Sequence, residues 1–198
     1  MQQLAAKHGA ARAKFETLRD AAAKKLEAKP VAPLALMDWI TLSTKVLRDE
    51  ASVVTLIAPV RDDPAWKDAI QRNIDSIFDA FVAAGRWADA GALVADPEAA
   101  LRHEVSQRDE SIAHIDSTKA KTDGPVPGTS ERMKRMMTTR FRDRVGRIYA
   151  SLLAAGRDEA AAKFADQARA ADPSPAMKQA LLSAAQGAGQ PRAQQQIR

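Results

Sequence analysis

The chain has 198 residues, of which 45% are hydrophobic and 28% are charged, values typical of a soluble globular protein. It has no cysteine, which excludes disulfides, thiolate metal sites and cysteine nucleophiles. A net charge of +5 permits an acidic partner, a membrane surface or nucleic acid and requires none of them.

The first predicted element is one alanine-rich helix within residues 1–29. A thin apolar stripe runs along it at spacings of three, four and seven residues, which is the periodicity of an amphipathic helix. The Lys29-Pro30 step ends the helix, because proline cannot continue the backbone hydrogen-bond ladder. We expect this helix to cap the fold or to act as an interaction arm. The stripe consists of Leu4, Ala11, Phe15, Leu18, Ala22 and Leu26.

Residues 34–116 are predicted to form the first half of a set of helix hairpins. Acidic residues stand near several predicted helix starts, and we interpret Asp49 and Asp63 as N-terminal caps because carboxylates there accept backbone N–H groups. Apolar periodicity with proline and glycine breaks predicts helices at about 34–47, 50–58, 64–84, 87–95 and 97–116.

The second half of the chain begins with a predicted flexible loop, residues 117–130. This loop is rich in Ser, Thr, Gly and Pro and is long for a compact helical domain, so it is either functional or mobile. Residues 131–187 are expected to hold a basic helix and a C-terminal hairpin, and 188–198 a frayed tail. The helices are predicted at about 130–155, 157–171 and 175–186.

One phrase occurs twice in the sequence. Residues 48–64 are RDEASVVTLIAPVRDDP and residues 157–173 are RDEAAAKFADQARAADP, and a shorter variant follows Arg86. The arginines Arg48, Arg86 and Arg157 are 38 and 71 residues apart, close to one and two periods in the mid-thirties. Such a period is typical of helix-hairpin repeats.

The last copy resembles the tetratricopeptide repeat. Gly156, Ala161, Ala168 and Pro173 stand where that family has its turn glycine, two packing alanines and closing proline. Three positions depart from the family pattern: Tyr149 replaces a small residue, the second-helix aromatic is shifted to Phe164, and Leu47 replaces the turn glycine of the first copy. The resemblance covers about half of the chain and implies an all-α, right-handed array of antiparallel hairpins. An irregular helical bundle without a sheet is the alternative.

The resemblance also implies a binding groove lined by the first helix of each hairpin. Asp75 and Asp79 fall where some members of the family clamp a peptide carboxylate with basic or amide groups, so that clamp is not expected in this chain. The residues expected to face the groove are Met37, Thr41, Lys45, Arg72, Asp75 and Asp79.

No catalytic or metal-binding motif is found. A zinc protease helix needs HExxH, but His103-Glu104 is followed by Gln107 where the second histidine is required. Phosphate-binding P-loops, GxSxG elbows and GxGxxG loops are missing too. We therefore expect a protein that is not an enzyme and that has no cofactor and no metal.

Residues 132–147, RMKRMMTTRFRDRVGR, form the predicted basic helix. Met133, Met137, Phe141 and Val145 make an apolar stripe along it, and arginines flank the stripe. The stripe can pack in a core beneath a solvated or ion-paired arginine face. Alternatively, the arginines bind an acidic protein, nucleic acid or an anionic membrane. The candidate basic patch is Arg135, Arg140, Arg142, Arg144 and Arg147.

These observations together favour a helical scaffold or adaptor that binds a protein partner. The alternative is a nucleic-acid-associated protein that uses the basic helix. No window approaches the roughly 18 apolar residues of a membrane-spanning helix, and the charged N-terminus has no signal-peptide core, so we expect a cytoplasmic protein. The chain could also be a domain of a longer protein.

Overall fold

The computed structural model describes residues 2–118 and 128–190, and these residues are helical without any strand, which confirms the all-α prediction. Most of the predicted loop 117–130 and of the tail 188–198 lies outside the described residues. The chain divides into two compact units, Met1–Arg86 and Trp87–Arg198, called the N-terminal and the C-terminal unit below. None of the described helices has the length and hydropathy that crossing a bilayer demands.

The N-terminal unit packs short helices around a core of branched and aromatic side chains. Leu36, Ile40, Val53, Ile77 and Phe81 are almost completely buried there. Helix α1 contacts α2 and η1, α2 contacts α4, and α3 contacts α5. The elements are α1 (Gln2–Lys25), α2 (Pro33–Thr41), the π-helix η1 (Leu42–Leu47), α3 (Glu50–Ile57), the 3-10 helix η2 (Ala58–Val60), α4 (Lys67–Arg72) and α5 (Ile74–Ala83).

The predicted single helix at 64–84 is wrong, because the chain breaks at Asn73 into α4 and α5. Asn73 leaves helical geometry, with φ −112° and ψ 14°. Its buried side-chain amide donates to the carbonyls of Ala69, at 2.8 Å, and Pro33, at 3.0 Å. The second bond joins α4 to the start of α2. Asp63 caps a turn here, accepting from the Ala65 N–H at 2.8 Å, and the helix itself begins only at Lys67.

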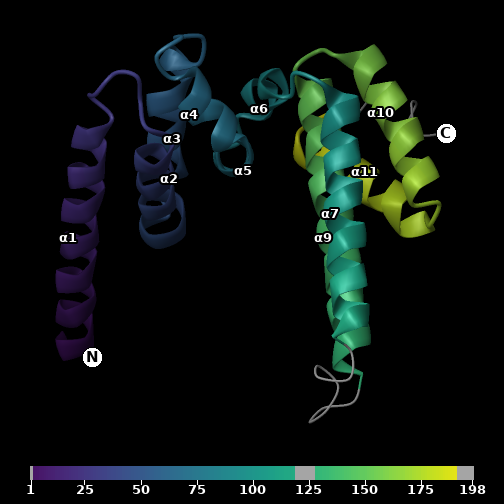
Figure 1. Ribbon diagram of the computed structural model, residues 1–198, viewed down its shortest axis with the longest axis horizontal. Coiled ribbons are helices and arrows are strands. Elements are labelled where there is room, and N and C mark those ends of the chain that lie inside the picture. The colour runs from purple at the N-terminus through teal and green to yellow at the C-terminus, as the bar shows by residue number, and fades with distance from the viewer. Residues whose placement is uncertain (1, 119–127, 191–198) are drawn as a thin grey trace. The chain divides into compact units, whose positions relative to one another are not determined.

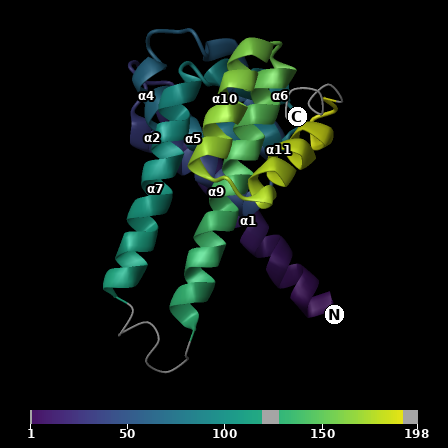
Figure 2. The same ribbon diagram turned by 90° about the vertical axis from the view of Figure 1, so that its right-hand side faces the viewer.

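The C-terminal unit is built around α9, which contacts the four other helices described in this unit (Figure 1). Tyr149 and Leu152 of α9, with Phe164, Met177 and Leu181 of its neighbours, are the largest fully buried side chains of this unit. Helices α7 and α9 lie side by side, and their ends near Ser117 and Thr129 extend beyond α10 and α11 (Figure 2). The elements are α6 (Trp87–Leu93), α7 (Pro97–Ser117), α9 (Thr129–Ala154), α10 (Asp158–Ala171) and α11 (Pro175–Gly187).

Two glycines let neighbouring helices approach α9 closely. A Cβ atom on Gly91 of α6 would lie 2.1 Å from the Ser151 carbonyl oxygen of α9. A Cβ on Gly146 of α9 would lie 2.9 Å from the Ala180 carbonyl oxygen of α11. Real side chains do not reach such distances from a backbone atom, so both crossings require glycine.

The twice-occurring phrase folds differently in its two positions. In the first copy the α-helix ends at Ile57, because Pro59 has no N–H and its ring obstructs the preceding turn. The equivalent position of the second copy is Ala168, and α10 continues through it to Ala171. The turns before the helices also differ, since the left-handed residue is Arg48 in the first copy and Gly156 in the second.

We expect Gly91→Ala to destabilise the C-terminal unit by about 3 kcal/mol, because overpacking against backbone forces α6 away from α9. Chemical denaturation followed by circular dichroism measures this change. Gly187→Ala in α11 is the control, since a Cβ there meets no atom within 4 Å. Its effect should stay within about 0.5 kcal/mol. Equal stability of the two variants would contradict the close crossing at Gly91.

Candidate interaction surfaces

Three of the predicted groove residues form one exposed stripe in the N-terminal unit. Met37 lies on α2, Thr41 ends that helix and Lys45 lies on η1, and all three side chains are exposed. Leu34 extends the stripe by one turn towards the start of α2. The opposite face of the same segment, which includes Leu36, is buried. The stripe is therefore apolar at its first end and polar at its second.

The other three predicted groove residues lie on two helices instead of one. Arg72 ends α4 and is exposed, and its Nε donates to Asp68 Oδ1 at 3.0 Å. Asp75 is exposed on α5, and Asp79 lies half-buried one turn further along. That all six residues line one groove stays a prediction.

Exposed large apolar side chains are concentrated in the N-terminal unit. Six such residues occur among the described side chains, and five of them belong to this unit. They lie on three elements that are in mutual contact, α1, α2 and η1. The sixth, Met136, lies on α9. The five are Phe15 at 38% exposed, Leu18 at 46%, Leu34 at 64%, Met37 at 45% and Val46 at 40%.

Two arginines of the predicted basic patch form ion pairs within the C-terminal unit. Arg142 Nε lies 2.7 Å from Asp172 Oδ2, which belongs to the residue after α10. Arg144 Nε lies 3.3 Å from Glu104 Oε1 on α7. All four side chains are largely buried, so these pairs connect α9 to its neighbours. Arg142 and Arg144 are therefore held by carboxylates of the same unit, and their part in a binding patch stays a prediction.

The predicted apolar stripe of α9 packs inward only at its C-terminal end. Phe141 and Val145 are buried, and the Arg108 guanidinium of α7 covers the Phe141 ring at 4.4 Å from its centroid. Met133 and Met137, nearer the N-terminal end of α9, are only half-buried.

The remaining arginines of this helix point outward. Arg135 and Arg140 are exposed and form no ion pair with any described residue, and Arg132, which was not in the predicted patch, shares this property. Arg147 is exposed at the edge of a cleft. The structure thus separates the predicted patch into two arginines with largely buried ion pairs and three arginines that are exposed.

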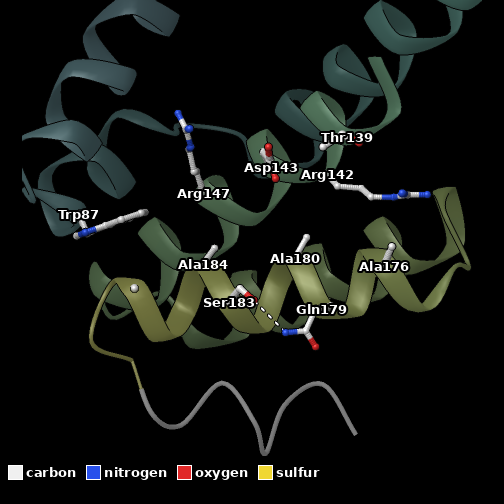
Figure 3. Close-up of a pocket in the computed structure, with 11 residues that line it drawn as sticks. Trp87, Thr139, Arg142, Asp143, Arg147, Ala176, Gln179, Ala180, Ser183 and Ala184 are labelled. Atoms are coloured by element: carbon white, nitrogen blue, oxygen red, sulfur yellow. Dashed lines mark hydrogen bonds between the residues drawn. The ribbon is translucent and has the colours of Figure 1, made fainter. Parts of the chain in front are cut away.

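A cleft of about 530 Å³ lies between α9 and α11, with Trp87 of α6 near one end (Figure 3). The Gln179 side-chain amide donates to Ser183 Oγ at 3.0 Å along the α11 wall. The sequence did not predict this cleft, because three helices far apart in the chain form its walls. The only local signal for the cleft was a row of three small residues on α11 that recur every four residues and so lie on one face of the helix. These small residues are Ala176, Ala180 and Ala184.

Burial and ion pairing shift the pKa values of Tyr149 and Asp172 in the same unit. Burial raises the pKa of Tyr149 to about 12, so its hydroxyl stays protonated at neutral pH. Burial also opposes ionisation of Asp172, but hydrogen bonds from Arg142 and Ser174 outweigh it and lower the pKa of that carboxyl. Asp172 is therefore charged at neutral pH and held by Arg142.

His103 and Gln107 of the incomplete HExxH motif lie on the same face of α7, as their spacing of four residues predicts. Gln107 Nε2 lies 2.9 Å from His103 Nε2, so the residue at the second histidine position does face the first. Within residues 2–118 and 128–190, no three His, Asp or Glu side chains are close enough to hold a metal ion.

Comparisons with known proteins give no relative for this chain. No protein-family model, no curated protein and no solved structure matches it.

We expect Arg142→Gln to lower the free energy of unfolding by about 2 kcal/mol at pH 7, because it leaves the largely buried Asp172 carboxylate without its charged donor. Since the folded pKa of Asp172 is lowered, the pair contributes above the unfolded pKa of about 3.9 and is lost as the pH falls. The deficit of the variant should therefore shrink towards pH 3 in urea titrations.

Arg140→Gln is the matched control for this prediction. It removes the same charge from an exposed position on the same helix, so its effect should stay within about 0.5 kcal/mol at every pH. A deficit of Arg142→Gln that does not change with pH would show that Asp172 is not its partner.

Proposed function

We propose that this protein is a non-enzymatic helical scaffold that binds a protein partner through its N-terminal unit. The supporting observation is the concentration of exposed large apolar side chains on α1, α2 and η1. Single exposed apolar residues are ordinary on protein surfaces, whereas contiguous exposed apolar patches typically mark an interaction site. The contacts among α1, α2 and η1 support such a patch. Burying apolar area contributes roughly 25 cal/mol per Å², which drives association with another protein.

A divergent tetratricopeptide-like array is the finer part of this proposal. Its support comes from the C-terminal hairpin, where Gly156 adopts a left-handed turn with φ 71° and both packing alanines, Ala161 and Ala168, are fully buried. The first copy of the phrase supports it less, because its helix is shortened before Pro59. Binding through α2 and η1 does not depend on this array.

The exposed stripe on α2 provides the test of the scaffold proposal. We expect Leu34→Gln combined with Met37→Gln to reduce partner binding at least about tenfold, because the apolar end of the stripe is lost. Both side chains are exposed, so the fold should persist, and circular dichroism checks this. A partner is first captured from nuclease-treated lysate of the source organism and identified. Its binding yield is then measured by titration against the purified wild-type and variant chains.

Thr55→Gln, at an exposed position of α3, is the control for this experiment and should leave the yield unchanged. A partner that binds the stripe variant as well as the wild type would exclude α2 as its binding surface.

A second candidate function, nucleic-acid binding, has its own supporting observation. Arg132, Arg135 and Arg140 are exposed on the N-terminal half of α9 and form no ion pair with the described residues. Arginines of this kind can neutralise phosphates, which releases counterions and makes binding strongly dependent on salt.

Changing Arg132, Arg135 and Arg140 together to Gln should weaken binding to a fluorescent DNA duplex. If all three contact phosphates, the slope of log affinity against log salt should fall by about 3. The control changes Lys24, Lys25 and Lys67 to Gln, which removes the same charge from the N-terminal unit. Equal losses in the two triple variants would indicate non-specific attraction, and no binding by the wild type would exclude this function.

A further inference from the structure

Helix α1 divides into a packed half and an uncovered half along one apolar seam. Ala22 near the end of α1 and Leu26 just after it are buried, and α1 contacts α2 and η1. Towards the N-terminus the same seam continues through Ala11, Phe15 and Leu18, which are exposed. The uncovered surface is therefore continuous with an interface that the fold already uses.

The spacing of this seam is that of a coiled coil. Ala11, Phe15, Leu18 and Ala22 follow one another at intervals of four, three and four residues, which are the a and d positions of a heptad. Phe15 and Ala22 take position a, and Ala11 and Leu18 take position d. So narrow a seam suits one neighbouring helix, whereas a helix that lies on a membrane has a much wider apolar face.

The positions beside the uncovered part of the seam are basic. In this register Arg12 and Arg19 occupy position e and Lys14 occupies position g, and Lys7 falls on position g in the sequence. Residues at e and g of a coiled coil face the corresponding residues of the partner helix and determine which partner is accepted. A partner of α1 is therefore selected by its charge.

The charge left unpaired on α1 is entirely positive among its described side chains. Its two carboxylates are already used, Glu16 by Arg12 at 3.0 Å and Asp20 by Arg19 at 3.2 Å. Lys14, Lys24 and Lys25 are exposed and have no ion pair within the described residues. Arg19 also bonds Asp49 at 3.2 Å and is half-buried, whereas the exposed Arg12 bonds only Glu16 of its own helix. Arg12 and Lys14 are therefore the flanking cations that a partner can reach.

A second copy of this chain does not suit the seam. A parallel pair of α1 helices would place position g of one beside position e of the other, and thus Lys14 beside Arg19. An antiparallel pair would place Lys14 beside Lys14 and Arg12 beside Arg12. Both arrangements oppose like charges at positions where they destabilise a coiled coil.

From this geometry we infer that the uncovered half of α1 binds an acidic amphipathic helix of a partner protein as a heterotypic coiled coil. The partner helix places apolar a and d residues against Phe15 and Leu18 and glutamates opposite Arg12 and Lys14. This inference rests on the proposed function of the N-terminal unit, but it uses α1 instead of the stripe on α2. It also fits the interaction arm that the sequence predicts.

A designed peptide pair tests the inference on the full chain. The acidic peptide is a fluorescent helix of about three heptads with leucine at a and d and glutamate at e and g, and the basic peptide has lysine at e and g. Fluorescence anisotropy at low salt should show at least about tenfold tighter binding of the acidic peptide. High salt should reduce this preference, because it screens the flanking charges.

Variants of α1 separate the seam from its flanks. Phe15→Gln with Leu18→Gln should weaken binding of the acidic peptide about tenfold or more, and both side chains are exposed, so the fold should persist. Arg12→Glu with Lys14→Glu should reverse the preference in favour of the basic peptide. Lys24→Glu makes the same kind of charge change on the side of α1 away from the seam and should have no effect. The Leu34→Gln, Met37→Gln variant should still bind the acidic peptide.

Several results would overturn the inference. Equal binding of the two peptides, or binding of neither, would exclude a charge-selected helix. Attachment to phosphatidylcholine–phosphatidylserine vesicles that disappears with Phe15→Gln and Leu18→Gln, without peptide selectivity, would assign the seam to a membrane. Self-association lost in the same variant would assign it to a second copy. None of these results decides whether a partner binds the stripe on α2, so the proposed function is tested separately.

Discussion

The C-terminal unit depends on how closely α6 and α11 approach the central helix α9. Glycine at Gly91 and Gly146 lets the backbones meet where any Cβ would collide with a carbonyl oxygen. Because α6 lies so near, the Arg157 guanidinium can donate to the Gly91 carbonyl at 3.2 Å and hold the end of that helix. The first residue of α6, Trp87, thereby comes to stand beside the cleft of α9 and α11.

Because of this packing, the arginines at the two ends of α9 have different surroundings. Its C-terminal part is surrounded by four helices, so a charge that lies there must be paired to offset its loss of water. Arg142 and Arg144 meet this requirement with carboxylates from other elements. The N-terminal part extends beyond α10 and α11, and its arginines can remain solvated. Burial decides which arginines of α9 form ion pairs with neighbouring elements and which stay exposed to a partner.

The N-terminal unit offers a different kind of surface. Its small helices bury their inner faces but leave apolar residues of α1, α2 and η1 exposed. A seam flanked by basic residues on α1 and a mixed stripe on α2 can bind different parts of a partner protein. The exposed arginines of the C-terminal unit have a separate chemistry, so the chain carries candidate surfaces for apolar and for anionic contacts.

Most of the secondary structure and one candidate surface were predictable from local sequence signals. Helices α7, α9, α10 and α11 begin and end within about two residues of the predicted bounds, because apolar periodicity and proline or glycine breaks act over neighbouring residues. The apolar seam of α1 follows from the same periodicity, whereas Met37, Thr41 and Lys45 were predicted from the resemblance to the tetratricopeptide repeat.

Long-range packing decided the rest. The break at Asn73 depends on a carbonyl 40 residues away in the chain, and the pairing of Arg142 and Arg144 depends on carboxylates 30 and 40 residues away. The cleft beside Trp87 needs three helices to meet. By itself the sequence determined which segments are helical and which faces are apolar, because these properties are local. Only the tertiary structure decided which charges are paired and which faces stay uncovered, because these depend on contacts between distant segments.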